Sequence, residues 1–111
     1  ALEGSLRATL KLTLLKSGQA ELPGKQVDKL LGETNDYWIT VGLDEDLDLA
    51  MKDAVRESIR FLHAQYGIDE ALALAYLSAA TDFEVSQVVD KTKGIHALIR
   101  KADFQDLEAA D

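Results

Sequence analysis

The run from Ser78 to Asp90 holds the polar residues that are best placed to do chemistry. Asp82 follows a run of small and apolar residues and precedes a predicted strand, and Gln87 lies inside an otherwise apolar stretch. Alternation places Gln87 on the same strand face as Val85 and Val89, so that its amide needs hydrogen-bond partners, because an unpaired buried amide costs roughly 1–3 kcal/mol. A functional role for Asp82 and Gln87 is one interpretation. The alternative is that Asp82 caps a turn and Gln87 bonds to the backbone.

A second acidic group, Asp44-Glu45-Asp46-Leu47-Asp48, has the spacing that opens a calcium-binding loop. Such a loop needs glycine at its sixth position and a bidentate glutamate at its twelfth, where this chain has Leu49 and Val55. Carboxylates are also favoured at the positive end of a helix dipole. The run therefore predicts the start of a helix and not a calcium site.

The two histidines do not form a metal site by their spacing. His63 falls near the end of a predicted acidic helix, where a partial positive charge is favoured. His96 lies in a predicted strand and faces the opposite way from its neighbours Ile95 and Ala97, as a solvated histidine would. One histidine in each region cannot define a zinc centre.

Nucleophilic chemistry has no motif in this chain. No G-x-S-x-G elbow occurs, and Ser78 and Ser86 have no histidine partner that the sequence identifies. The glycines are dispersed and form no phosphate-binding loop. The chain contains no cysteine, which excludes disulfides and thiolate catalysis.

Two strands are predicted before the acidic run. Residues 5–16 alternate cleanly, which predicts a half-buried strand with one wet face. Residues 36–41 are aromatic and β-branched and end at Gly42, as strands do. The stretch from 19 to 34 reads as a loop that could hold one more short strand. The apolar face of the first strand consists of Leu6, Ala8, Leu10, Leu12 and Leu14.

Two helices and two more strands follow. Apolar residues at three- and four-residue steps predict a helix from Leu47 to Tyr66, with Asp44 or Asp46 capping its start and Gly67 its end. Asp69 caps a second helix, 70–80, whose apolar residues lie nearly all round and predict burial between two layers. Strands are expected at 83–89 and 95–99. The predicted fold is α+β, with mostly antiparallel strands packed on a helical hairpin in the order β-β-α-α-β-β, in a single domain over residues 1–111.

Composition limits the partners. The 111 residues are 47% apolar and carry a net charge of −8. Residues 1–43 hold five basic and five acidic side chains, whereas residues 44–111 hold seven and fifteen. A negative surface repels phosphate backbones, so we expect neither nucleic acid nor a membrane as partner. No stretch approaches the roughly 20 apolar residues of a membrane span, and the first residues do not resemble a signal peptide, so we expect a cytoplasmic location.

Four segments, taken together, resemble the carboxy-terminal region of the acetamidase/formamidase family. Their order and spacing match that region, and the resemblance extends from Ala1 to Phe104. The first residues, Ala1-Leu2-Glu3, resemble the end of the family's glycine- and acid-rich central motif. The four segments are residues 36–51, Tyr66-Gly67 with the following helix, Asp82-x-x-x-x-Gln87-Val88-Val89-Asp90, and Gly94-Ile95-His96-Ala97.

The resemblance implies hydrolysis of formamide- or acetamide-like amides to ammonia and a carboxylate. It implies a divalent metal ion, with zinc as the candidate, that activates a water molecule. Glu3 is then the expected catalytic residue, as metal ligand or general base. Asp82 is a second catalytic candidate, and Gln87 is a candidate for binding the substrate. At Val41 the chain departs from the family pattern, where a polar residue is expected, which weakens the inference that this strand lines the substrate pocket.

Two functions from different classes remain open at this point. In the first, the chain is the carboxy-terminal fragment or subunit of an amidase, which acts with a missing amino-terminal portion or as a homo-oligomer. In the second, it is a non-catalytic domain of the same architecture that serves assembly or ligand binding. The alternating strand at 5–16 bears on this choice, because an exposed edge strand usually finds a partner.

Overall fold

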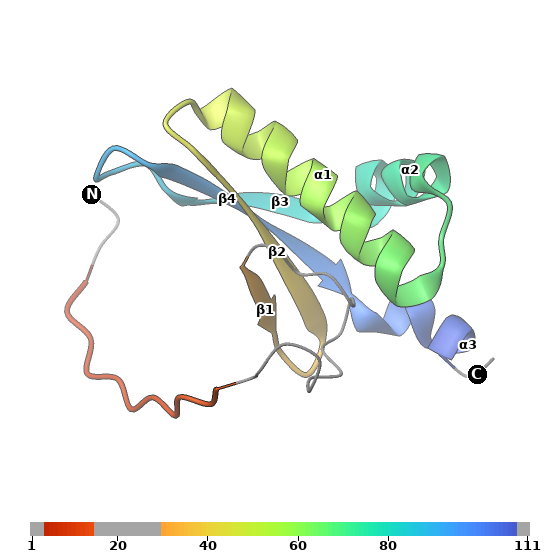
Figure 1. Ribbon diagram of the computed structural model, residues 1–111, viewed down its shortest axis with the longest axis horizontal. Helices are drawn as coiled ribbons and strands as arrows, with labels where there is room; N and C mark the ends of the chain where they lie inside the picture. The colour runs from red at the N-terminus through yellow and green to blue at the C-terminus, as the bar shows by residue number, and fades with distance from the viewer. Residues whose placement is uncertain (1–3, 15–29, 109–111) are drawn as a thin grey trace.

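The computed structural model describes residues 4–14 and 30–108 and contains a four-stranded antiparallel sheet (Figure 1). Its strands are β1 (Leu31–Glu33), β2 (Tyr37–Asp44), β3 (Asp82–Gln87) and β4 (Lys93–Arg100), in the spatial order β1-β2-β4-β3. The two long strands, β2 and β4, pair along their whole length at the centre. The shorter strands form the two edges.

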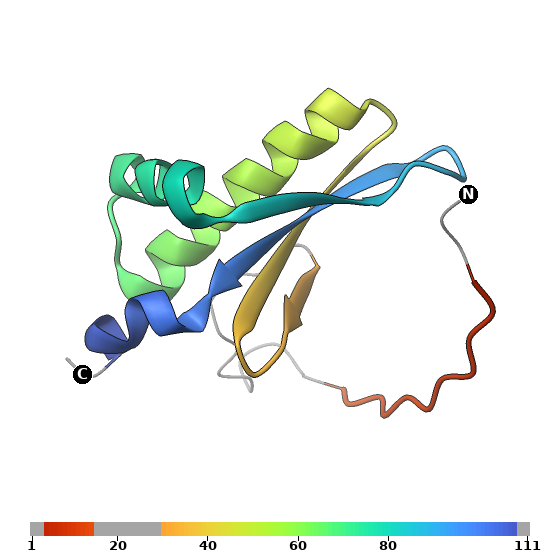
Figure 2. The same cartoon turned by 180° about the vertical axis from the view of Figure 1, so that it is seen from behind.

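Two helices connect β2 to β3. Helix α1 (Leu47–Tyr66) packs across β2 and β4, and α2 (Glu70–Ala80) packs against α1 (Figures 1 and 2). After β4 the chain forms a 3₁₀ turn, η1 (Lys101–Phe104), and a single helical turn, α3 (Gln105–Glu108). The order β-β-α-α-β-β and the α+β class are therefore confirmed. No helix among the described residues is long and apolar enough to cross a bilayer.

The ends of α1 form as the sequence predicts. The Asp46 side chain accepts a hydrogen bond from the backbone N–H of Leu49 at 3.0 Å, which satisfies a donor that the first turn leaves unpaired. Gly67 adopts φ 66°, and its N–H donates to the carbonyl of His63 at 2.9 Å. The acidic run is thus explained by helix capping. His63 lies in the last turn, with Nδ1 2.9 Å from the carbonyl oxygen of Ile68.

Helix α2 also begins at its predicted cap, because Asp69 accepts from the backbone N–H groups of the first turn. The expectation that α2 is buried between two layers is wrong. Ala73 and Leu77 are buried, but Leu72 is 62% exposed and Leu74 is 46% exposed. The helix packs against α1 along one flank, and no described residues cover its other flank. Its apolar composition therefore leaves apolar surface uncovered.

The strand predicted at residues 5–16 is also absent from its described part. Residues 4–14 form no regular secondary structure, and residues 15 and 16 lie outside the described residues. In Figures 1 and 2 the segment runs clear of the sheet. A strand needs a ladder partner for its backbone groups and a core for its apolar face, and the described residues supply neither to this segment. The first strand of the order is instead β1, which lies in the stretch from 19 to 34 where the sequence allows one more short strand.

The main core lies between α1 and the two central strands. Its largest fully buried side chains are Leu62 of α1, Leu77 of α2 and Ile99 of β4. Trp38 joins this core at the start of β2, where its indole N–H donates to the Tyr66 hydroxyl at 2.8 Å. This contact ties the end of α1 to the sheet.

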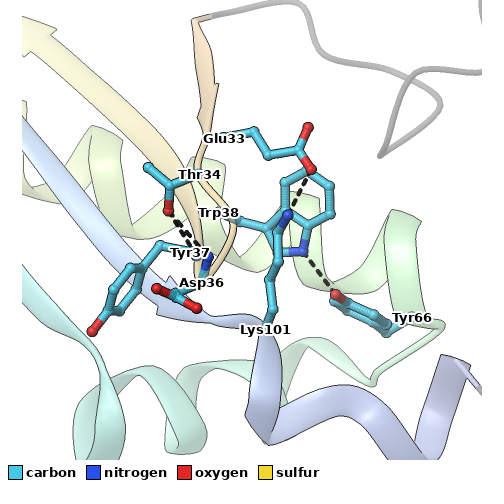
Figure 3. Close-up of polar contacts among 7 residues, drawn as sticks. All are labelled: Glu33, Thr34, Asp36, Tyr37, Trp38, Tyr66 and Lys101. Atoms are coloured by element: carbon cyan, nitrogen blue, oxygen red, sulfur yellow. Dashed lines mark hydrogen bonds and ion pairs between the residues drawn. The ribbon is translucent and has the colours of Figure 1, made fainter.

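The outer side of Trp38 is covered by a lysine (Figure 3). Lys101 Nζ lies 4.1 Å from the centroid of the Trp38 ring and 2.6 Å from Glu33 Oε1. The ammonium group thus combines an ion pair with a cation–π contact. Beside it, the Thr34 hydroxyl accepts from the backbone N–H groups of Asp36 and Tyr37 and closes the β1–β2 turn.

Gly42 allows α1 to approach β2 closely. A Cβ atom at this position would lie 2.2 Å from the carbonyl oxygen of Ala50 and 2.2 Å from the amide nitrogen of Ala54. Both alanines are fully buried. A side chain at Gly42, or a larger one at Ala50 or Ala54, would separate the helix from the sheet. The contact therefore depends on small residues on both elements.

Candidate functional site

The helices cover one face of the sheet and leave the other uncovered by any described element. On β2 the helix-side residues Trp38 and Thr40 are buried, whereas the residues that follow each of them, Ile39 and Val41, are half-buried. The register continues this alternation across the sheet. We call the uncovered side the open face. It carries Tyr37, Ile39, Val41 and Leu43 from β2, His96, Leu98 and Arg100 from β4, and Asp82 and Glu84 from β3.

Asp82 lies at one end of the open face, beside a polar groove of about 460 Å³. It is the first residue of β3, directly after α2, and it stands opposite Leu98 in the ladder. Its side chain is exposed, and no hydrogen bond or ion pair to it occurs within residues 4–14 and 30–108. The groove is lined by Tyr37, Ser78, Ala79, Ala80, Thr81, Asp82, Leu98 and Arg100.

The groove contains one positive and one negative side chain. The Arg100 guanidinium is held by Asp103, with Nε and Nη2 each 3.2 Å from Oδ2. It still lines the groove together with Asp82 and the Tyr37 ring. A neutral molecule with a donor at one end and an acceptor at the other suits such a groove, because carboxylates accept and guanidinium groups donate.

A second polar group lies farther along β3, at the hairpin end of the open face. Glu84 stands opposite His96 in the ladder, and His96 Nε2 lies 3.5 Å from Glu84 Oε2. The other ring nitrogen, Nδ1, lies 2.7 Å from the Ser86 hydroxyl. The expectation that Ser86 has no histidine partner is therefore wrong. An imidazole between a hydroxyl and a carboxylate can accept the hydroxyl proton while the carboxylate stabilises the imidazolium.

The geometry of this group is open to solvent. Glu84 is 57% exposed, whereas the His96 side chain is 25% exposed. Interactions between exposed charges are weakened by water and salt. His96 does face away from Ile95 and Ala97, which are both buried, as its strand position predicts.

Gln87 ends β3 and supports the hairpin turn. Its Nε2 donates to the carbonyl oxygen of Thr92 at 2.7 Å, which is the backbone-bonding alternative that the sequence allows. The expectation that Gln87 occupies a buried strand face is wrong, because the residue is exposed. A bulge between Val85 and Gln87 shifts the register and brings Gln87 opposite Gly94, so the simple alternation fails here.

The residues that the sequence singles out do not converge within the described part of the chain. Asp82 and Gln87 stand at opposite ends of β3, about 17 Å apart along the strand at 3.3 Å per residue. Glu3 lies outside the described residues. Among residues 4–14 and 30–108, no group of three or more His, Asp or Glu side chains is placed to hold a metal ion.

The Ser86–His96–Glu84 group is the feature that sequence reasoning misses. Its signal is partly present, since alternation places Glu84 and Ser86 on one face of their strand and His96 opposite its buried neighbours. The missing information is the register of the hairpin. The bulge at Val85 and Gln87 sets that register near Ser86, and its position does not follow from alternation.

Comparison with solved structures identifies a neighbour of related fold. The chain superposes on the acetamidase from Bacillus halodurans with a TM-score of 0.63 and 28% sequence identity. The match covers 68% of this chain and 25% of the acetamidase chain. No protein-family model matches the sequence, and a search of curated proteins found no match. The chain thus shares the architecture of about a quarter of an acetamidase.

Proposed function

We propose that this chain forms part of a hydrolase of short linear amides, which releases ammonia and a carboxylate. The observation that carries the proposal is the structural match to an acetamidase at 28% identity. Because the chain spans a quarter of that protein's length, it would act together with a further amino-terminal portion or within an oligomer. The preferred substrates are formamide- or acetamide-like.

The polar groove suits the two ends of a primary amide. The Asp82 carboxylate would accept a hydrogen bond from the amide N–H, and Arg100 and the Tyr37 hydroxyl would donate to the carbonyl oxygen. Donors on the carbonyl oxygen stabilise the negative charge that develops there when water adds to the carbon. The C–N bond then breaks, and a proton passes to the nitrogen as ammonia leaves. Asp82 is in this scheme the residue that orients the amide.

Glu3 and Gln87 have different roles in the proposed reaction. We keep Glu3 as the catalytic residue, as general base or metal ligand, from the position of the family motif at residues 1–3. Gln87 uses its Nε2 for Thr92, which leaves its side-chain oxygen as the group that would accept from a substrate. A short amide cannot span the roughly 17 Å between the two ends of β3, so a substrate held by Gln87 would occupy a site separate from the groove at Asp82.

The divalent metal ion that the resemblance implies does not fit the described residues. The groove at Asp82 also holds the Arg100 guanidinium, whose charge opposes a bound cation. We therefore derive no step through a metal from this groove. A zinc ion that takes part in the reaction would draw its ligands from residues outside the described part, with Glu3 as the candidate from this chain.

Ammonia release from formamide and acetamide tests the proposal. The purified protein is assayed with and without added zinc, and the intact mass of every polypeptide in the sample is measured beside it. We expect ammonia release that needs a second polypeptide or an oligomer. Asp82→Asn should lower kcat/KM by roughly 100-fold by misplacing the amide. Asp48→Asn, in the first turn of α1, is the matched control and should leave the rate unchanged.

The outcomes separate the two functions. Ammonia release that falls in Asp82→Asn but not in Asp48→Asn supports an amidase that uses the groove. A single species of 12.2 kDa that releases no ammonia with or without zinc would exclude an enzyme that acts alone and would favour a structural or binding role. Equal rates for both variants would remove Asp82 from the reaction.

A non-catalytic role in assembly is the second candidate, and one observation favours it. Leu6, Leu10, Leu12 and Leu14 are all between 79% and 92% exposed. So much apolar surface on one short segment is typical of a protein–protein contact. Under this alternative the groove at Asp82 would take no part in chemistry.

A further inference from the structure

Strand β3 has one unpaired edge. It forms hydrogen bonds with β4 on one side, and within residues 4–14 and 30–108 no strand lies on its other side. An exposed edge presents a row of unpaired N–H and C=O groups and favours the addition of another strand. Its six residues, Asp82–Gln87, are enough for a short ladder.

Residues 5–14 have the pattern of a strand that lacks a partner. Leucines at alternate positions form one face, and Leu12 is 92% exposed while Leu6 is 87% exposed. Arg7 and Lys11 lie on the opposite face of an extended chain. The segment therefore combines an apolar face, a basic face and unpaired backbone groups.

The side of β3 that faces the helices offers space for apolar side chains. A pocket of about 220 Å³ lies between α1, α2 and β3, and its lining is largely apolar. Val85 of β3 is 46% exposed at this side, and Leu74 of α2 is 46% exposed. A strand added to β3 would extend the sheet beneath these residues. The pocket is lined by Met51, Val55, Leu74, Leu77, Ser78, Thr81 and Phe83.

The charges and the alternation of side chains favour the same arrangement of residues 5–14 on β3. Phe83 and Val85 point to the helix side of β3, so Asp82 and Glu84 point to the open face. Any register that turns the leucines of residues 5–14 toward the helix side turns Arg7 and Lys11 toward the open face, because side chains alternate. The two basic residues then lie on the same face as the two acidic ones. Opposite charges across neighbouring strands stabilise the pair.

We propose that residues 5–14 of one copy of this chain add as a strand to the free edge of β3 in a second copy, in a reciprocal dimer. A second copy is the occupant because Leu6, Leu10, Leu12 and Leu14 stay 79–92% exposed in their own copy, so that another molecule is needed to cover them. In Figure 1 the segment runs clear of its own sheet. Two-fold symmetry allows both copies to exchange the same segment and closes the assembly. Asp82 takes part in both proposals, but the dimer is measured without an amide substrate, so its failure can be told apart from a failure of amide hydrolysis.

Reversal of the charges tests the contact. The molar mass of the full chain is measured by analytical ultracentrifugation over a roughly hundred-fold range of concentration. We expect a concentration-dependent dimer for the unmodified chain. Arg7→Glu/Lys11→Glu and Asp82→Lys/Glu84→Lys should each weaken the dimer by roughly tenfold or more, because like charges then face each other. Lys52→Glu/Arg56→Glu, which makes the same charge change on exposed positions of α1, should leave the dimer unchanged.

Mixing the two charge-reversed variants is the decisive step. Both contacts in the mixed dimer pair opposite charges, so the dimer should return. Hydrogen exchange should show protected amides in residues 5–14 that lose protection on dilution. A chain that stays monomeric at every concentration overturns the proposal. So does protection that is independent of concentration, which means pairing within one copy, and so does a dimer that survives both reversals.

Discussion

Strand β2 and residues 5–14 are both predicted to be strands, and they reach different structures. Residues 5–14 alternate polar and apolar side chains, whereas β2 has Trp38, Thr40 and Gly42 on one face and Ile39, Val41 and Leu43 on the other. In β2 every second residue from Trp38 to Gly42 is buried, whereas Leu10 and Leu12 of the other segment are 79% and 92% exposed. Alternation therefore gives a segment two chemically different faces. It does not provide the layer that covers one of them.

The difference comes from the neighbours of each segment. β2 pairs with β1 on one side and with β4 on the other, and α1 follows it after two residues and packs on it. Its backbone groups and its helix-side face are thus satisfied by adjacent parts of the same chain. Among the described residues, nothing pairs with residues 5–14. A strand is a property of a segment together with its partners.

The largest expected effect comes from a substitution that forces α1, which covers β2, away from the strand. Gly42→Ala places a Cβ atom 2.2 Å from backbone atoms of α1, which requires the helix to move off the sheet. We expect the free energy of unfolding to fall by more than about 3 kcal/mol, beyond ordinary overpacking. Urea denaturation followed by circular dichroism measures it.

Gly4→Ala is the matched control in the exposed segment. A Cβ atom at Gly4 would meet nothing within 4 Å, so the free energy of unfolding should change by less than about 0.5 kcal/mol. Equal effects of the two substitutions would contradict the comparison between the covered and uncovered segments. Retained stability in Gly42→Ala would show that α1 does not depend on this close approach.

The sequence predicts most of the elements whose form depends on contacts between residues close in the chain. The helix Leu47–Tyr66 and its caps follow from periodicity and local hydrogen bonds, and the structure has the same bounds. The failures involve distant partners. Residues 5–14 lack a ladder and α2 lacks a second layer, whereas β1, which forms where one short strand is allowed, is too short to have a period that fixes its bounds. Tertiary context decides all three, and no local pattern contains it.

In the candidate site, too, the local sequence predicts some features and misses those that depend on distant partners. Asp82 stands at the helix-to-strand junction that its sequence context predicts, and His96 faces away from the core as alternation predicts. The pairing of Ser86 with His96 is missed because the hairpin register includes a bulge. The buried face expected for Gln87 fails for the same reason. A one-residue shift in register changes which side chains meet.

A smaller effect is expected inside the β2–α1 contact, at its buried hydroxyl pair. The Ser58 hydroxyl donates to the carbonyl of Ala54 at 2.8 Å, so the Thr40 hydroxyl, 2.6 Å away, donates to Ser58. Ser58→Ala leaves the Thr40 hydroxyl buried without a partner and should lower the free energy of unfolding by about 1–3 kcal/mol. Thr40→Val should cost less, because Ser58 keeps its bond to Ala54.

A double-mutant cycle isolates the pair. The combined variant Thr40→Val/Ser58→Ala should be more stable than Ser58→Ala alone, because no unpaired hydroxyl remains. Chemical denaturation of the four proteins at one temperature gives the coupling energy. Additive losses would mean that water reaches Thr40 and satisfies it, and the cover over β2 would then be looser than its burial indicates.

The smallest expected effect compares the exposed and the packed flank of a single helix, α2. One flank exposes Leu72, whereas the other packs Tyr76 edge-on against Phe104, with ring centroids 4.8 Å apart. Burial, the hydrogen bond to Asp103 at 2.8 Å and the charge of that carboxylate raise the pKa of Tyr76 to about 12. In an unfolded chain a tyrosine titrates near about 10.

The sign of the pH dependence follows from the raised pKa of Tyr76. Its stabilising contribution is fully present below about pH 10 and is lost as the pH rises through about 12, because the folded state holds the proton longer than the unfolded state does. Between these values the free energy of unfolding should fall faster in the unmodified chain than in Tyr76→Phe. Phenolate absorbance of the two proteins gives the ionisation of Tyr76 by difference. A midpoint near pH 10 would mean that water reaches this flank of α2 as freely as it reaches Leu72.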